Sequence, residues 1–220
     1  MQHLPDKHFI TRLYRRFCNL IYHECSWAYD ITSFVVSAGQ WNAWRTIAFK
    51  YLSKGNTLEL GCGTGYLLKE GLSQKLDITG FDISAQMLKH SGNLLKKNHL
   101  NGPLVRGNGM QLPFLNASFK NIVATFPEQY ITQTQTISEC ARILDDSPDH
   151  NSKIIILGRW IVLHHPILRI LFPVFYRLPS ESQKNEVKSL FNTHGLNAQF
   201  HEHRMGLVSV YVIEAKFSSN

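Results

Sequence analysis

Cysteine is scarce in this chain of 220 residues, which contains four: Cys18, Cys25, Cys62 and Cys140. No two of them form a C-x-x-C pair, and no arrangement of Cys and His matches the spacing of zinc ligands. A disulfide-stabilised secreted scaffold and a zinc module are therefore excluded. We expect reduced thiols, no bound metal and a cytoplasmic location.

Concentrated charge and long apolar runs are lacking as well. The net charge is +7, but the 23 Lys and Arg residues are dispersed. Without an Arg-rich tract or an RNA-binding appendage, nucleic acid is not an expected partner. The positive charge is consistent with a basic soluble enzyme, and also with a preference for a membrane surface or an anionic substrate. Charged residues interrupt the first apolar stretch, so no signal peptide is expected.

The signatures of the two commonest phosphate-binding turns are absent, although a glycine-rich turn is present. An apolar strand over residues 57–61 leads into Gly61, Gly63 and Gly65. No Lys follows, which excludes a P-loop, and Tyr66 stands where a dinucleotide fingerprint needs its third glycine. The three glycines leave the backbone of the turn unshielded by side chains, and a helix N-terminus with unpaired N–H groups follows. These two features still predict a nucleotide-binding turn.

Two acids accompany this turn. Glu59 lies in the strand before it, and Asp82 ends a second apolar strand at residues 77–82. An acid at the end of the second strand of a βαβ unit can accept hydrogen bonds from ribose hydroxyls. Two acids without a basic residue suit a ligand that carries ribose and a positive charge.

Four motifs in chain order then resemble class I S-adenosylmethionine (SAM) methyltransferases. Glu59–Gly65 and Phe81–Ser84 resemble the family's glycine turn and acidic strand end. Gly107–Phe114, hereafter the third motif, resembles its G-D-A-x-x-L-P-F, and Phe119–Phe126 resembles its F-D-x-V strand. The resemblance covers roughly residues 55–160.

The resemblance implies an α/β fold: a Rossmann-like, seven-stranded, mostly parallel sheet with an antiparallel edge and helices on both faces. It implies a single domain, residues 1–220. Within it we expect an N-terminal helical lid (1–52), a SAM-binding core (53–160), and an acceptor-side insertion with edge strands (161–220).

The alternation of apolar segments fits that fold, because strands that alternate with helices form parallel sheets with right-handed crossovers. The expected strands are 57–61, 77–82, 103–107, 120–126, 153–158, 198–204 and 207–217. The expected helices are 5 to about 50 in two stretches, 64–74, 84–98, 132–144 and 183–194. Ser84 is an expected N-cap, and Gly195 is an expected helix stop.

The resemblance also implies which residues bind SAM, or its product S-adenosylhomocysteine (SAH). They are Tyr29, Glu59, Gly61, Cys62, Gly63, Thr64, Gly65, Asp82, Ile83, Met87, Asn108, Gly109, Met110, Thr125 and Phe126. Two positions depart from the family, since Asn108 and Asn121 stand where it has Asp. Asn108 still offers an amide to adenine, so we expect weaker or retuned binding, whereas Asn121 is expected to serve structure at the strand start. Neutral drift at both positions is the alternative.

Two segments outside the core have open interpretations. Tyr29 and Asp30 resemble a pair that closes over the cofactor in related enzymes, or Tyr29 simply packs helices on the sheet. Residues 160–178 are the longest apolar stretch, but histidines, prolines and Arg169 make it unsuitable as a transmembrane helix, which needs about 20 mainly apolar residues. They predict either an apolar wall for the acceptor, with peripheral membrane contact, or an ordinary helix on the sheet.

Methyl transfer is an in-line displacement that depends mainly on positioning, so few catalytic residues are expected. Glu128, Tyr130, His164 and His165 are candidates to accept a proton from the acceptor, or else caps and solvated side chains. We expect a SAM-dependent methyltransferase with a small, apolar acceptor. A SAM-binding protein of this fold without methyl transfer is the alternative from another class, and an RNA or protein methyltransferase is a further one. The acceptor, the methylated atom and the oligomeric state stay open.

Overall fold

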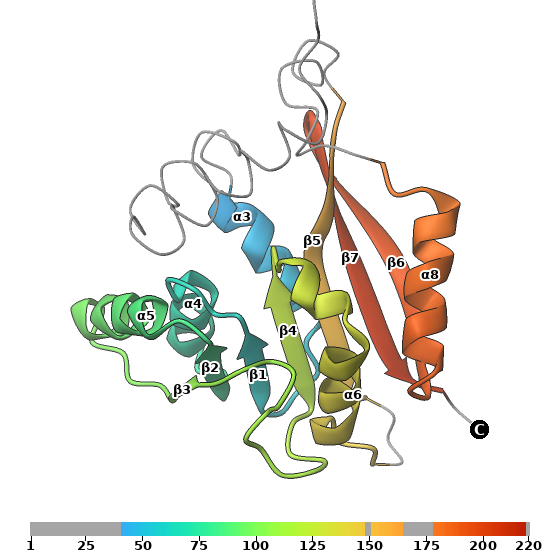
Figure 1. Ribbon diagram of the computed structural model, residues 1–220. Helices are drawn as coiled ribbons and strands as arrows, with labels where there is room; N and C mark the ends of the chain where they lie inside the picture. The colour runs from blue at the N-terminus through green and yellow to red at the C-terminus, as the bar shows by residue number, and fades with distance from the viewer. Residues whose placement is uncertain (1–40, 148–150, 165–177, 219–220) are drawn as a thin grey trace, which may run out of the picture. The chain divides into compact units, whose positions relative to one another are not determined.

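The computed structural model describes residues 41–147, 151–164 and 178–218, and the features below belong to the compact unit Trp44–Asn220. Its centre is a seven-stranded sheet of order β3-β2-β1-β4-β5-β7-β6 (Figure 1). The first five strands in this order are parallel, and β7 runs antiparallel to both of its neighbours. The strands are β1 (Thr57–Leu60), β2 (Ile78–Asp82), β3 (Leu104–Arg106), β4 (Asn121–Thr125), β5 (Lys153–Leu163), β6 (Leu196–Met205) and β7 (Val208–Phe217).

Helices cover both faces of this sheet. Their bounds are α3 (Trp41–Arg45), the 3-10 helix η1 (Thr46–Tyr51), α4 (Tyr66–Ser73), α5 (Ala85–Lys97), the 3-10 helix η2 (Gln129–Thr132), α6 (Thr134–Ile143) and α8 (Glu181–Asn192). The predicted Rossmann-like architecture with an antiparallel edge is thereby confirmed.

The strand register decides which side chains face which helices. Leu58 and Leu60 share a buried cluster with Ile137 of α6 and Phe191 of α8, and α6 and α8 lie on the near side of the sheet in Figure 1. Because side chains alternate along a strand, Glu59 points to the opposite face. On that face Leu68 of α4 and Leu95 of α5 pack on Ile78.

β5 is longer than the sequence pattern predicts. It continues to Leu163 and pairs with β7 on both sides of an irregularity between Leu157 and Ile161. Trp160, expected to open an acceptor-side insertion, is instead a buried strand residue that packs on Phe200. The expected strand over 153–158 is therefore too short, because cross-strand pairing continues past the bulge as far as Leu163. Residues 165–177 lie outside the described part.

Other local predictions agree with the structure. The Ser84 hydroxyl caps α5 by accepting a hydrogen bond from the Met87 amide at 3.3 Å. Gly195 follows α8 with a φ of 74°. Asn121 is structural, since its side chain makes two hydrogen bonds to the backbone of Ser53. Its Oδ1 accepts the Ser53 amide at 2.8 Å, and its Nδ2 donates to the Ser53 carbonyl at 3.0 Å.

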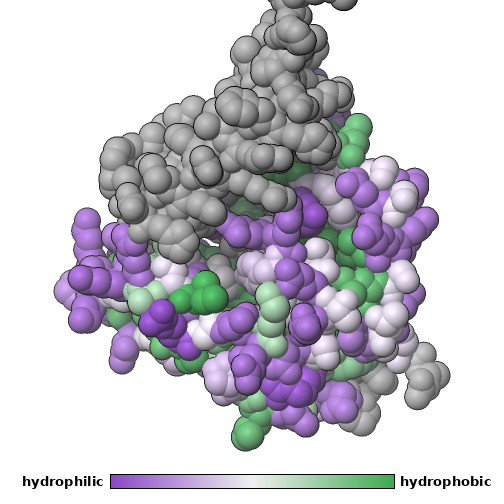
Figure 2. All heavy atoms as spheres, in the orientation of Figure 1, coloured by the Kyte–Doolittle hydropathy of each residue, from purple (hydrophilic) through white to green (hydrophobic). Residues whose placement is uncertain are grey.

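Residues 1–40, and with them most of the expected lid and Tyr29, lie outside the described part. Of the expected second helical stretch, residues 41–51 are helical, first as α3 and then as η1. Within the described ranges no helix is long and apolar enough to cross a membrane. Figure 2 shows hydrophilic side chains over most of the coloured surface in this view, with apolar side chains in small patches.

Candidate functional site

The glycine turn, Gly61–Gly65, joins β1 to α4 at the carboxyl ends of the central strands. Its three glycines have positive φ values, 78°, 52° and 80°, which L-residues rarely adopt. A Cβ on Gly61 would lie 2.5 Å from the Tyr130 hydroxyl, and one on Gly65 would collide with the Ser91 hydroxyl. Among the described residues, no atom lies within 4 Å of the place that a Cβ on Gly63 would take. Gly63 is thus the glycine that faces open space, where a ligand can approach bare backbone.

Asp82 holds this turn and the next loop together. One carboxylate oxygen accepts the Gly63 amide at 2.9 Å, and the other accepts the Ser84 amide at 2.8 Å. A carboxylate oxygen can accept two hydrogen bonds, so each oxygen can also bond a ribose hydroxyl. The side chain expected to bind ribose therefore also shapes the turn.

Glu59 is fully buried beneath the turn. Burial raises the pKa of its carboxyl to about 8, although Arg45 and a hydrogen bond from the Leu68 backbone lower it. Its Oε2 atom has no hydrogen-bond partner among the described residues. Such a group fits a ligand amine or a bound water, and without one it is mostly protonated at neutral pH.

Other predicted cofactor residues of the turn and of α5 are buried. Cys62 is buried, and burial raises the pKa of its thiol. Thr64 is buried too, and its hydroxyl finds no partner in the described part of the chain. Met87 is buried in α5, whereas Ile83, expected beside adenine, is 64% exposed. An exposed apolar side chain next to Asp82 can cover a planar base.

The third motif lies against Asp82. The Gly107 amide donates to the Asp82 carbonyl at 3.1 Å. The Asn108 side-chain oxygen accepts the Met110 amide at 3.0 Å and so shapes its own turn. Gly109 packs against the ring of Tyr130, and Asn108 itself is exposed.

The end of β4 carries a strained residue. Phe126, directly after Thr125, has a φ of 49°, which is uncommon for a residue with a side chain. Its ring lies 6.3 Å from that of Trp44 and occupies the place that a Cβ on Gly158 would need. Such strain often occurs at functional sites, and here it lies on the predicted acceptor side.

The candidate proton acceptors differ in their surroundings. Burial raises the pKa of Tyr130 far above its ordinary value, and the hydroxyl donates to the Leu60 carbonyl at 3.4 Å. Glu128 is exposed. His164 is exposed as well, and its Nε2 lies 2.7 Å from the Ser209 hydroxyl and 3.9 Å from Glu202. His165 lies outside the described part.

Ser91 is a residue that the sequence analysis missed. It is fully buried in α5, and its hydroxyl donates to the Gly63 carbonyl at 3.4 Å. A serine on the apolar face of an amphipathic helix was the signal that could have singled it out.

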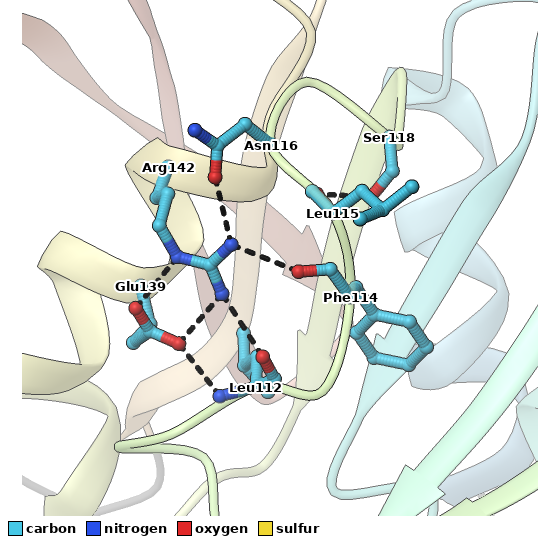
Figure 3. Close-up of polar contacts among 7 residues, drawn as sticks. All are labelled: Leu112, Phe114, Leu115, Asn116, Ser118, Glu139 and Arg142. Carbon is cyan, nitrogen blue, oxygen red and sulfur yellow. Dashed lines mark hydrogen bonds and ion pairs between the residues drawn. The ribbon is translucent and has the colours of Figure 1, made fainter.

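An ion pair on α6 was missed as well (Figure 3). Arg142 bonds both oxygens of Glu139 at 2.8 Å, and one of these oxygens accepts the Leu112 amide at 2.7 Å. Arg142 also donates to the carbonyls of Leu112 and Phe114, at 2.9 and 2.8 Å. This pair, which we call the α6 clamp, fixes the loop that ends the third motif.

These features fit SAM better than a metal ion. Across the described residues no group of three or more His, Cys, Asp or Glu side chains could hold a metal. A glycine facing open space, a carboxylate at the end of β2 and an unpartnered buried acid match the groups of an amino-acid nucleoside.

Comparisons with known proteins agree with this geometry. Residues 57–147 match the family described as "Methyltransferase domain". Demethylmenaquinone methyltransferase from Listeria welshimeri is 28% identical over 176 residues, which cover 74% of each chain.

Two solved structures share the fold. A structure titled as SAM-dependent methyltransferases from Methanosarcina mazei has a TM-score of 0.57 and 16% identity, covering 79% of this chain and 98% of its own. Magnesium protoporphyrin IX methyltransferase from Synechocystis, solved with bound SAH, has a TM-score of 0.55 and 16% identity, covering 80% of each chain.

The strand order, the glycine turn and Asp82 define a class I, Rossmann-like fold of the SAM-binding type. The match over residues 57–147 shows that this segment of the chain is a methyltransferase domain.

Proposed function

We propose that the protein transfers the methyl group of SAM to a small, apolar acceptor. The observation that carries the proposal is the open space at Gly63, whose amide is held by Asp82 at 2.9 Å. The relatives named as demethylmenaquinone methyltransferases support an aromatic, quinone-like acceptor.

In this proposal the residues mainly bind and orient. SAM, when bound, supplies an electrophilic methyl group on a sulfonium. Asp82 would accept the ribose hydroxyls, Glu59 and Thr64 would meet the amino-acid end, and Ile83 and Asn108 would meet adenine. Thr125 and Phe126 would border the acceptor and exclude water from it, which favours displacement.

A SAM-binding protein without methyl transfer is the second candidate. Two observations favour it: Asn108 stands where the family has an acid, and Tyr130, the half-buried candidate base, has a strongly raised pKa. An acceptor that is ionised before it binds needs no base, so methyl transfer does not require one here. Turnover separates the two candidates.

The test is calorimetric titration of the purified protein with SAM, SAH and NAD, followed by an acceptor panel of quinols, phenols and lipids. Binding of SAM and SAH without NAD, and SAH formation with one acceptor class, is the expected result. Binding without turnover across the panel would favour the second candidate, and no binding would overturn both.

A further inference from the structure

We propose that Tyr130 is a positioning residue that fixes the glycine turn against the third motif. This role rests on the proposed function, because it concerns the same cofactor site. It replaces the role of proton acceptor expected for this residue from the sequence.

The backbone that carries Tyr130 is held in place by the core. Tyr130 lies in η2, where the next residue, Ile131, is fully buried in the main cluster. The Ile131 amide donates to the Glu128 carbonyl at 3.3 Å, and the Gln133 amide donates to the Tyr130 carbonyl at 3.0 Å. The side chain therefore starts from a fixed point just after the end of β4.

From that point the side chain reaches both cofactor loops. The hydroxyl donates to the Leu60 carbonyl at 3.4 Å and fills the space that a Cβ on Gly61 would need, 2.5 Å away. The Cε2 atom of the ring lies 3.4 Å from the place that a Cβ on Gly109 would take. One side chain thus bonds the residue before the glycine turn and lies beside the middle of the third motif, with no room to spare for a side chain at Gly109.

Such a link has a clear physical purpose. β1 and β3 are not neighbours in the sheet, because β2 lies between them. Strand pairing therefore sets the distance between the loops that follow β1 and β3 only indirectly, through β2 and Asp82, whereas Tyr130 links them through a single side chain. A cofactor that spans both loops binds best when that distance is fixed beforehand, since ordering costs are then already met.

The surroundings of the hydroxyl also disfavour a role as base. Burial is the main cause that raises the pKa of Tyr130, and the charge of Asp82 adds to it. A phenol that stays protonated at neutral pH can donate to the Leu60 carbonyl but cannot take a proton from an acceptor.

Calorimetric titration with SAH tests this role in Tyr130→Phe and Tyr130→Ala. Loss of one hydrogen bond in the Phe variant should weaken SAH binding roughly threefold to tenfold, and the Ala variant should weaken it further. Tyr211→Phe is the matched control, because it loses a comparable bond to Glu202, 3.0 Å long, on β7. Its affinity should equal that of the wild type.

A double-mutant cycle with Gly61→Ala tests the contact itself. The strain of a Cβ at positive φ is present in either background, whereas the clash with the hydroxyl is absent when Tyr130 is Ala. The two changes should therefore be less damaging together than the sum of their separate effects on unfolding. Additive effects would overturn the contact.

The outcomes separate this role from the proposed function. If the wild type fails to bind SAH, the proposed function falls and this role falls with it. If the wild type binds and both Tyr130 variants bind equally well while unfolding cooperatively, this role alone is overturned. Absorbance titration near 295 nm adds a signature: a phenolate that forms below about pH 9 and is lost in Tyr130→Phe would restore the role of base.

Discussion

At the scale of single residues, Asp82 shapes two loops and is also the side chain proposed to bind ribose. Its two oxygens hold the amides of Gly63 and Ser84, and each can accept one bond more. If Asp82 also binds ribose as proposed, replacing it removes a ligand contact and loosens the turn at once.

We expect Asp82→Ala to weaken SAM binding by about 1–3 kcal/mol, the cost of leaving polar groups unpaired. Calorimetry measures the change. Asp77→Ala is the control, since Asp77 is an exposed acid just before the same strand. Unchanged affinity in Asp82→Ala would mean that the ribose lies elsewhere.

Glu59 predicts an unusual pH dependence of stability. Because burial raises its folded-state pKa from 4.5 to about 8, the folded chain retains a proton that the unfolded chain releases. The stability from this group is complete below the unfolded pKa and is lost as pH rises through the folded pKa. The loss approaches about 1.4 kcal/mol per pH unit between these values.

Glu59→Gln should remove this dependence. The free energy of unfolding of the wild type, relative to the Gln variant, should fall as the pH rises from 5 to 8, as measured by denaturant titration. Other titrating groups cancel in the difference. A difference that stays flat over this range would contradict the raised pKa.

At the scale of secondary-structure elements, two contacts outside the sheet ladder decide local geometry. The α6 clamp joins α6 to the loop after the third motif, and the Phe126–Gly158 contact joins the end of β4 to the bulge of β5. Each gives a prediction with a control in the same chain.

Arg142→Ala should lower the free energy of unfolding by about 1–3 kcal/mol, because Glu139 and two carbonyls lose their donor. Hydrogen exchange at the Leu112 amide should accelerate as the loop loosens. Lys184→Ala on α8 removes an ion pair whose Glu181 side chain is 79% exposed, and it should leave the free energy of unfolding nearly unchanged because water screens such a pair. Equal losses of unfolding free energy in the two variants would mean that the α6 clamp stabilises the protein no more than an exposed ion pair does.

Gly158→Ala should destabilise the protein by more than about 2 kcal/mol, because strain at positive φ adds to a collision with the Phe126 ring. Gly206→Ala provides the control: its φ of 63° brings the same strain, but its Cβ would meet no atom of the described residues within 4 Å. The difference between the two variants in thermal or chemical unfolding isolates the collision. A difference near zero would mean that Phe126 moves aside without cost.

At the scale of the whole molecule, ligand binding and folding are linked. SAH at about 100 times its dissociation constant should raise the free energy of unfolding by about 2.7 kcal/mol, provided that it binds the folded chain alone. Denaturant titration with and without SAH measures this, and NAD at equal concentration is the control. Equal stabilisation by NAD would contradict a SAM-selective site.

The sequence predicted the sheet well, because apolar strands and glycine stops are local signals. It placed Asn121 correctly as a structural residue, since Asn121 bonds Ser53 at the strand start. It missed the true end of β5, because an apolar strand that continues past a bulge looks like a strand followed by an apolar insertion.

The site was less accessible to sequence reasoning. Motif order indicated Gly63 and Asp82, but not that Asp82 holds the Gly63 amide. The environments of Ser91 and Tyr130 depend on packing between segments that are distant in the chain, which no local pattern encodes. Tyr130 therefore looked like a polar residue at a strand end, available for catalysis.

The packing of Phe126 on Gly158 also constrains how this protein can diversify. A larger residue at 158 calls for a smaller one at 126, so enlargement at 158 is coupled to position 126. A library of single substitutions would therefore yield few folded variants with larger side chains at position 158. Randomising both positions together is the direct route to folded variants with a larger side chain at 158, and natural homologues should show compensating exchanges between the two positions.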